Sequence, residues 1–198
     1  MDAIMDALTQ KKEWILDQER GFARDLARGV IEVPKLSMWV ILIPILLVYH
    51  LSRHKSAIKG RTAFAEHYLL SRTRSLEEAC SALAEQRPPD IDGVVAKAVD
   101  LPETARTAYR DWITVLIRHY ADLLQAPGTD FKTLVHSAYR SHSNYLLLLN
   151  QLNQLEKTLN AALKNHVGEA AQSVVDTIAR IETNSAELRR LQAEALFA

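Results

Sequence analysis

The chain contains 198 residues, of which 48% are hydrophobic and 24% charged, and its formal net charge at pH 7 is zero. This length is typical of one domain, and the charge balance excludes a bulk attraction to nucleic acid. Glycine and proline number six each, while helix-forming residues dominate, so we predict an all-α protein. The single cysteine, Cys80, cannot form an internal disulfide, and its amphipathic surroundings favour a buried structural role.

Residues 1–34 predict an N-terminal amphipathic helix. Apolar residues recur at helical spacing between positions 3 and 29, and one face carries Ile4, Leu8, Ile15, Phe22 and Leu26. Lys12 and Glu19 interrupt the edge of this face. We expect the face to pack on other helices or on a second copy of the chain, with binding to a membrane surface as the alternative.

Residues 35–53, KLSMWVILIPILLVYHLSR, contain no charge between the two cations that border them. Moving outward from Pro44, the segment has aromatic rings at Trp39 and Tyr49 and then the cations Lys35 and Arg53. Rings followed by cations are typical of the interface between a membrane and water. We therefore predict that residues 35–53 are a membrane anchor in contact with membrane lipids.

Two topologies fit this segment about equally well. The 17 residues between the two cations span about 26 Å as a helix, which is short for a hydrocarbon core of about 30 Å. A single crossing places Pro44 at the midplane, whereas a re-entrant hairpin places it at the deepest point. A core helix of a soluble bundle is the least favoured interpretation, because it leaves the paired rings and cations unexplained.

Residues 54–74 predict a basic juxtamembrane helix. Positions 53–74 hold six Lys and Arg residues and one acidic residue, Glu66. The positive-inside rule then predicts a cell-membrane protein whose C-terminal domain lies on the cytoplasmic side. The cations that we expect to contact anionic lipid headgroups are Lys55, Lys59 and Arg61.

Residues 75–152 predict a small antiparallel helical domain. Ser75 and Glu78 have the spacing of a capping box, so we expect a new helix to begin there. The sequence RPPDIDG at 87–93 predicts a loop, because prolines and aspartates disfavour a helix interior.

The centre of this domain is a predicted helical hairpin. Its first helix covers 103–125, and APGTD at 126–130 predicts a tight reversal in which Thr129 or Asp130 caps the next helix. One stripe of the first helix has core spacing and consists of Tyr109, Trp112, Leu116, Tyr120 and Leu123.

Residues 153–198 predict a coiled-coil-like C-terminal helix. No convincing stop appears from Tyr145 onward, so we expect one long helix or two nearly continuous ones, beginning near residue 131 and continuing to the C-terminus. Steps of three and four residues define a helix-pairing seam, whose members are Leu152, Leu155, Leu159, Val167, Val174, Ile181 and Leu188. Such a seam predicts a homo-oligomer or a helical protein partner.

The sequence contains no recognisable template for chemistry. His50 and His54 share a helix face, but no carboxylate is spaced to join them. Zinc, di-iron, serine-hydrolase and phosphate-loop motifs do not occur in the chain. We therefore expect no catalytic residue, no metal, no cofactor, no small-molecule substrate and no nucleic acid as a partner.

These features predict a non-enzymatic, membrane-anchored scaffold or adaptor that associates through long amphipathic helices. The alternative is an accessory subunit of a larger membrane enzyme or transporter complex, in which other membrane spans surround the anchor. An enzyme in its own right ranks third.

Overall fold

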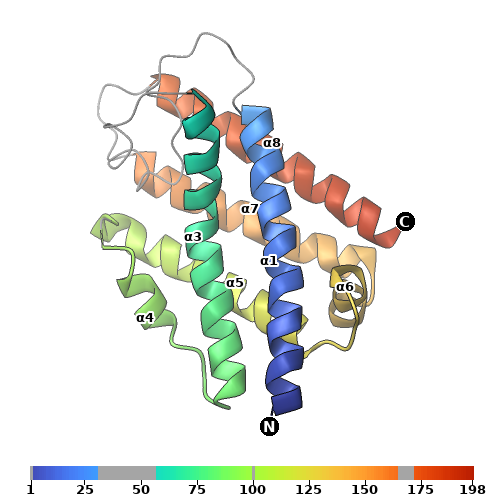
Figure 1. Ribbon diagram of the computed structural model, residues 1–198. Helices are drawn as coiled ribbons and strands as arrows, with labels where there is room; N and C mark the ends of the chain where they lie inside the picture. Colours follow the sequence, from blue (N-terminus) through green and yellow to red (C-terminus); the bar gives the residue numbers. More distant parts are fainter. Residues whose placement is uncertain (1, 31–56, 100, 165–171) are drawn as a thin grey trace.

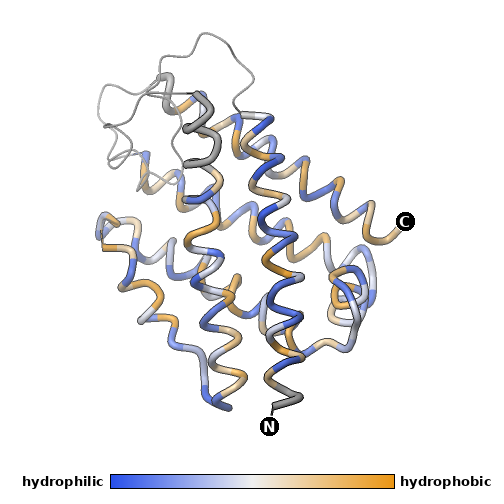
Figure 2. Tube along the Cα trace, viewed as in Figure 1, coloured by the Kyte–Doolittle hydropathy of each residue, from blue (hydrophilic) through white to orange (hydrophobic). Residues whose placement is uncertain are grey.

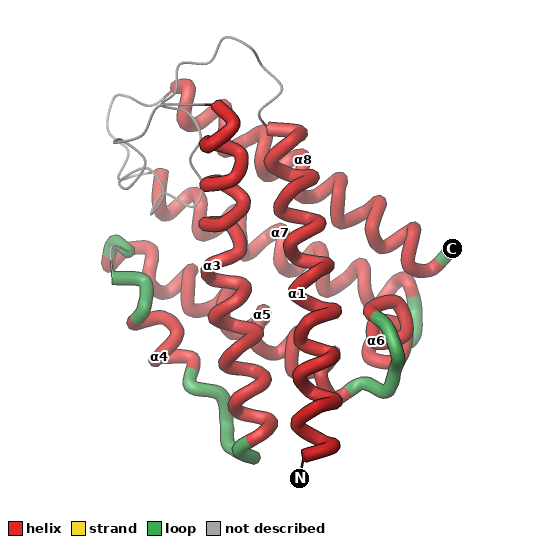
Figure 3. The backbone as a smooth tube through the Cα atoms, viewed as in Figure 1, coloured by secondary structure: helices red, strands yellow, loops and turns green. Residues whose placement is uncertain are grey.

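The computed structural model describes residues 2–30, 57–99, 101–164 and 172–198. Within these ranges the regular elements are seven α-helices and no strand (Figures 1 and 3), which confirms the all-α prediction. The bounds of the helices are α1 Asp2–Val30, α3 Ala57–Ala84, α4 Ile91–Ala96, α5 Glu103–Gln125, α6 Phe131–Tyr139, α7 His142–Lys164 and α8 Gln172–Phe197.

The long helices form two layers. In Figure 1, α1 and α3 lie side by side as an antiparallel pair in front of α5, α7 and α8, which cross behind them. In the rear layer α5 packs on α7 and α7 packs on α8, while α3 contacts α5 and α1 contacts α8. The short helices α4 and α6 lie against the two layers from the sides.

Helix α1 buries the apolar face that its sequence predicts. Ile15, Phe22 and Leu26 are buried, and they contact other helices of the same chain. At its outer edge, the Lys11 ammonium donates to the carbonyls of Leu124 at 3.0 Å and Ala126 at 2.8 Å. These bonds satisfy carbonyls that the C-terminus of α5 leaves without helical partners, so α1 also caps a helix of the rear layer.

Helix α3 continues through the predicted capping box, so that prediction is wrong. Ser75 is fully buried, and its hydroxyl donates to the Ser71 carbonyl one turn earlier at 2.8 Å. Glu78 instead accepts from Arg87 and, at 2.7 Å, from the Asp90 amide in the following loop. Because a serine inside a helix can bond to the backbone of the preceding turn, the motif did not mark a helix start here.

The first helix of the central hairpin and the reversal that follows it agree with the sequence. Helix α5 spans the predicted residues, and all five members of its aromatic and aliphatic stripe are buried. The Asp130 carboxylate accepts from the Thr133 amide at 2.8 Å, and the Thr133 hydroxyl accepts from the Asp130 amide at 3.1 Å. This reciprocal capping box starts α6 at the predicted position.

The predicted long C-terminal helix is wrong. Helix α6 ends after Tyr139, because Arg140 adopts a left-handed conformation with φ of 63°. Helix α7 begins two residues later, and α7 and α8 are separate helices that pack on each other (Figure 1). No glycine or proline marks the break at Arg140, so the sequence offered no signal for it.

Replacing Arg140 with glycine is expected to raise the free energy of unfolding by about 0.5 kcal/mol. The left-handed conformation costs an L-residue about 1–2 kcal/mol, and glycine relieves that cost while losing about 0.5–1 kcal/mol of chain entropy. Urea unfolding followed by circular dichroism measures the change. The matched control is Arg118→Gly on the exposed side of α5, which is expected to destabilise by about 1 kcal/mol. An equal loss of unfolding free energy in both variants would contradict the left-handed conformation of Arg140.

The interior consists of two apolar clusters. The larger joins α1, α3, α4, α5, α6, α7 and α8, and includes Leu76, Leu116 and Leu149. Cys80 is half-buried against it, and burial raises the pKa of its thiol. The smaller cluster, here called the α1–α3–α8 cluster, comprises Phe22, Ala23, Leu26, Ala27, Tyr68, Ile178 and Ile181. Apolar and polar residues alternate along every described helix in Figure 2, as expected for helices that bury one face.

No helix in the described ranges is long and apolar enough to cross a membrane. The predicted anchor, with Lys35, Trp39, Pro44, Tyr49 and Arg53, lies outside the described residues, as does Lys55. Lys59 and Arg61 belong to the first turns of α3.

Candidate functional site

Four charged side chains, two buried arginines and two mostly buried glutamates, meet in the interior of the bundle. They are Glu19 from α1, Arg72 from α3, Glu156 from α7 and Arg189 from α8, and we call them the charge tetrad. Each comes from a different helix, so the tetrad links both helices of the front layer to α7 and α8 of the rear layer.

Arg72 lies at the centre of the tetrad and contacts both carboxylates. Its Nη1 donates to both oxygens of Glu19 at 3.1 Å, and its Nη2 donates to Glu156 Oε1 at 2.7 Å. Arg189 approaches Glu156 with two parallel bonds, Nη2 to Oε1 at 2.6 Å and Nη1 to Oε2 at 2.8 Å. This forked geometry is the strongest form of a pair between arginine and a carboxylate.

The tetrad is almost completely removed from water. The exposed fraction is 4% for the Arg72 side chain and 3% for Arg189, compared with 14% for Glu19 and 17% for Glu156. A buried charge without a partner is very unfavourable, whereas two cations with two anions leave no net charge to solvate. The four residues therefore depend on one another for burial.

Aromatic side chains add further contacts to the tetrad. The Tyr120 hydroxyl donates to Glu19 Oε1 at 2.8 Å, and the Trp112 indole donates to Glu156 Oε1 at 3.2 Å. The Arg72 guanidinium lies 4.7 Å from the centre of the Tyr68 ring and 5.7 Å from that of Trp112, within range of cation–π attraction. The aromatic stripe of α5 thus contacts both the apolar core and the charges.

The charges shift the pKa values of their neighbours. Burial by itself raises the pKa of Glu156, but the positive charges of Arg189 and Arg72 outweigh burial and hold it below its ordinary value. Burial raises the pKa of Tyr68 to about 12, against the opposing effect of Arg72. The carboxylate is therefore ionised and the phenol is neutral at physiological pH.

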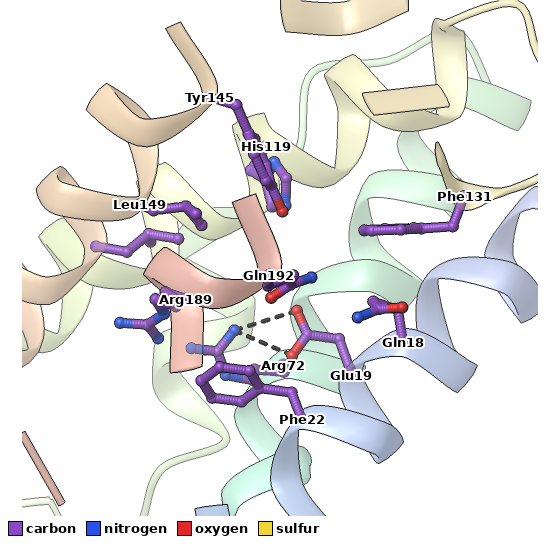
Figure 4. A pocket seen from close by; sticks show the side chains of 11 residues that line it. Gln18, Glu19, Phe22, Arg72, His119, Phe131, Tyr145, Leu149, Arg189 and Gln192 are labelled. Atoms are coloured by element: carbon purple, nitrogen blue, oxygen red, sulfur yellow. Dashed lines mark hydrogen bonds and ion pairs between the residues drawn. The ribbon is translucent and has the colours of Figure 1, made fainter. Parts of the chain in front are cut away.

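A small cavity lies beside the tetrad (Figure 4). Its walls come from five helices besides α3, and they include Gln18, Glu19, Phe131, Tyr145 and Gln192. The cavity volume is about 30 Å³, which accommodates one or two water molecules and is far below the size of an ordinary ligand pocket. Arg72 also lines it, and its Nε has no hydrogen-bond partner among the described residues.

His119 forms another wall of this cavity and is buried as a neutral group. Its Nδ1 lies 2.5 Å from the Tyr139 hydroxyl. Burial, together with the nearby charges of Arg72 and Arg189, lowers the pKa of His119 to about 3.

The stability of the protein is therefore expected to fall by about 2 kcal/mol between pH 7 and pH 5 on account of His119. The unfolded chain binds a proton at His119 below about pH 6.5, and the folded chain does not until about pH 3. The folded state consequently loses stability as pH falls through this window. Urea unfolding at both pH values measures the loss, and His119→Gln is expected to remove about that much of it. An unchanged pH dependence in this variant would contradict the burial of a neutral imidazole.

The arrangement fits a structural and positioning role better than chemistry on a substrate. The acceptor atoms of both carboxylates are occupied by side chains of the same protein, so none is free to act as a base. Within the ranges that the structure describes, no three His, Cys, Asp or Glu side chains come together as a metal site.

The predicted helix-pairing seam is largely used within the chain. Leu152 and Leu159 are buried in the larger cluster and Ile181 in the α1–α3–α8 cluster, while Leu155 and Leu188 are half-buried against these clusters. The side chains of Val167 and Val174 lie outside the described part of the structure. The described seam residues therefore contact α1, α5 and each other's helices instead of remaining exposed.

The tetrad itself was missed in the sequence. By spacing alone, Glu19 is an interruption of an apolar edge, and Arg72 is one of the cations of the segment 53–74. The available signal was a charge in an apolar register: Glu19 stands four residues after Ile15, and Arg72 lies midway between Tyr68 and Leu76. Because helical residues four apart share a face, these charges had to point into the core.

Comparison of the chain with protein-family models, with curated proteins and with solved structures finds no match.

Proposed function

We propose that this protein is a non-enzymatic, membrane-attached scaffold or adaptor. The apolar segment 35–53 holds it to the lipid bilayer, and the helical bundle is the platform that other molecules contact. The observation that carries this proposal is the uncharged stretch centred on Pro44, with rings and then cations on both sides, inserted between two helices of one bundle.

The interior of the bundle supports a platform rather than an enzyme. The charges of the tetrad pair with one another, and the cavity beside them has a volume of about 30 Å³, which leaves room for only one or two waters. A bundle whose buried charges pair internally is well suited to hold a fixed surface in place.

The burial of the seam bears on how the protein associates with itself or with a helical partner. Leu152, Leu159 and Ile181 are occupied within the chain, so association through them would require the bundle to open. Self-association or partner binding in our proposal uses the outer surface of the bundle or the membrane segment, and not the seam.

Membrane attachment is tested by sedimenting lysed cells that express the full chain. We expect the protein in the membrane pellet and its release by detergent. Placing charges in the apolar segment, with Ile41→Asp and Leu46→Asp together, is expected to move the protein to the supernatant, because each charge costs about 2.5–3.5 kcal/mol in a membrane interior. The control is Leu147→Asp, on an exposed position of α7, which should stay in the pellet. Wild-type protein in the supernatant without detergent would overturn the proposal.

A further inference from the structure

The two helices that flank the apolar segment are partners in one hairpin. Glu19 of α1 bonds to Arg72 of α3, and one turn further along α1 the Phe22 ring stacks on Tyr68 with 5.9 Å between ring centres. Positions therefore rise along α1 as they fall along α3, which is the pairing of antiparallel helices. The end of α1 at Val30 consequently lies beside the first turns of α3, at one end of the bundle (Figure 1).

This pairing is an integral part of the core. The α1–α3–α8 cluster needs Phe22 and Leu26 from one flank of the apolar segment and Tyr68 from the other. The charge tetrad also needs both flanks, because Glu19 and Arg72 neutralise each other where water is excluded. Moving α1 to the opposite side of a membrane from α3 would expose these apolar side chains and leave both charges without their partner.

From this pairing we infer that α1, α3 and the rest of the described bundle lie on one side of the membrane. Val30 at the end of α1 and Ala57 at the start of α3 therefore lie on that same side. Of the two topologies that the sequence allowed, a single crossing is incompatible with this fold, because it separates α1 from α3. The inference rests on the proposed membrane attachment, and it adds that α1 and α3, which flank the apolar segment, lie on the same side of the membrane.

The charges at this end of the bundle agree with a membrane-facing position. Arg28 lies in the last turn of α1, and Lys59 and Arg61 lie in the first turns of α3. Arg28 is exposed and pairs with Asp25 at 3.0 Å, whereas the sequence of the first turns of α3 adds two cations and no acidic residue. Anionic phospholipid headgroups are the lipid class that a net positive charge at this end of the chain segment would attract.

The test places one cysteine on each side of the apolar segment in the full chain. Cys80→Ser removes the natural thiol, and the probe sites are Gln10→Cys in α1, Glu66→Cys in α3 and Glu194→Cys in α8, all at exposed positions. Each variant is treated with a membrane-impermeant maleimide, first in intact cells and then after the membrane has been permeabilised. We expect all three thiols to react under the same condition and in the same proportion.

The outcomes separate this inference from the proposed function. Labelling of the α1 cysteine from the face opposite to the α3 and α8 cysteines, in protein that pellets with membranes, would overturn the inference and leave membrane attachment standing. Protein that fails to pellet with membranes would overturn both.

Vesicles of neutral and of anionic phospholipid provide a second measurement. We expect the Lys59→Gln and Arg61→Gln variants to bind anionic vesicles less well than the unchanged protein, and to bind neutral vesicles equally well. An equal loss of binding to the two kinds of vesicle would contradict the role of the cations.

Discussion

Glu156→Gln is expected to lower the free energy of unfolding by about 3–5 kcal/mol, which is the typical cost of removing one partner from a buried ion pair. Glu156 accepts hydrogen bonds from Arg72, Arg189 and Trp112. The variant keeps the size of the side chain but leaves two buried guanidinium groups with one carboxylate, that of Glu19. Urea unfolding of the full chain in detergent, followed by circular dichroism, measures the loss.

The matched control for this variant is Glu187→Gln. The Glu187 carboxylate also bonds to an arginine, Arg190 at 2.6 Å, but its side chain is 54% exposed. Exposed pairs contribute about 0–1 kcal/mol, so the control should change stability little. Combining Glu156→Gln with Arg189→Met should cost less than the sum of the two single variants, because it restores the balance of charge. Equal effects of Glu156→Gln and Glu187→Gln would show that burial does not set the strength of the tetrad.

Leu26→Ala is expected to destabilise the protein by about 2–5 kcal/mol, the range for truncating a buried leucine. Leu26 is fully buried in the α1–α3–α8 cluster, so truncation removes apolar contacts and leaves a cavity. Because this cluster holds α1 against α3 and α8, the variant should also increase protease cleavage and amide hydrogen exchange in the second half of α1.

Leu147→Ala is the control for Leu26→Ala, since it makes the same chemical change at a position that is 71% exposed. Substitutions at such surface positions usually change stability by less than about 0.5 kcal/mol. If the two variants lost equal stability, or if exchange in α1 stayed unchanged in Leu26→Ala, then α1 would not be held in the way described here.

The sequence by itself determined the helical class and several local features, because these depend on residues close together in the chain. The end of α5 followed from the Ala126–Pro127–Gly128 reversal. The Asp130 cap and the apolar face of α1 could likewise be predicted from spacing alone. Local sequence patterns gave wrong predictions at two positions. At Ser75 the hydroxyl bonds to the preceding turn and does not cap a new helix, and at Arg140 the helix ends without a glycine.

The tertiary structure alone decided which helices pair and where the charges lie. Spacing cannot show that the partners of the apolar face of α1 are α3 and α8, or that the C-terminal seam folds back within its own chain. These contacts join positions many helical turns apart in the chain, for example 53 residues between Glu19 and Arg72 and 33 between Glu156 and Arg189. The charge tetrad is the clearest case, since each of its members looks unfavourable on its own helix. Only when four helices bring two cations and two anions together, away from water, does burial of all four become compatible with a stable fold.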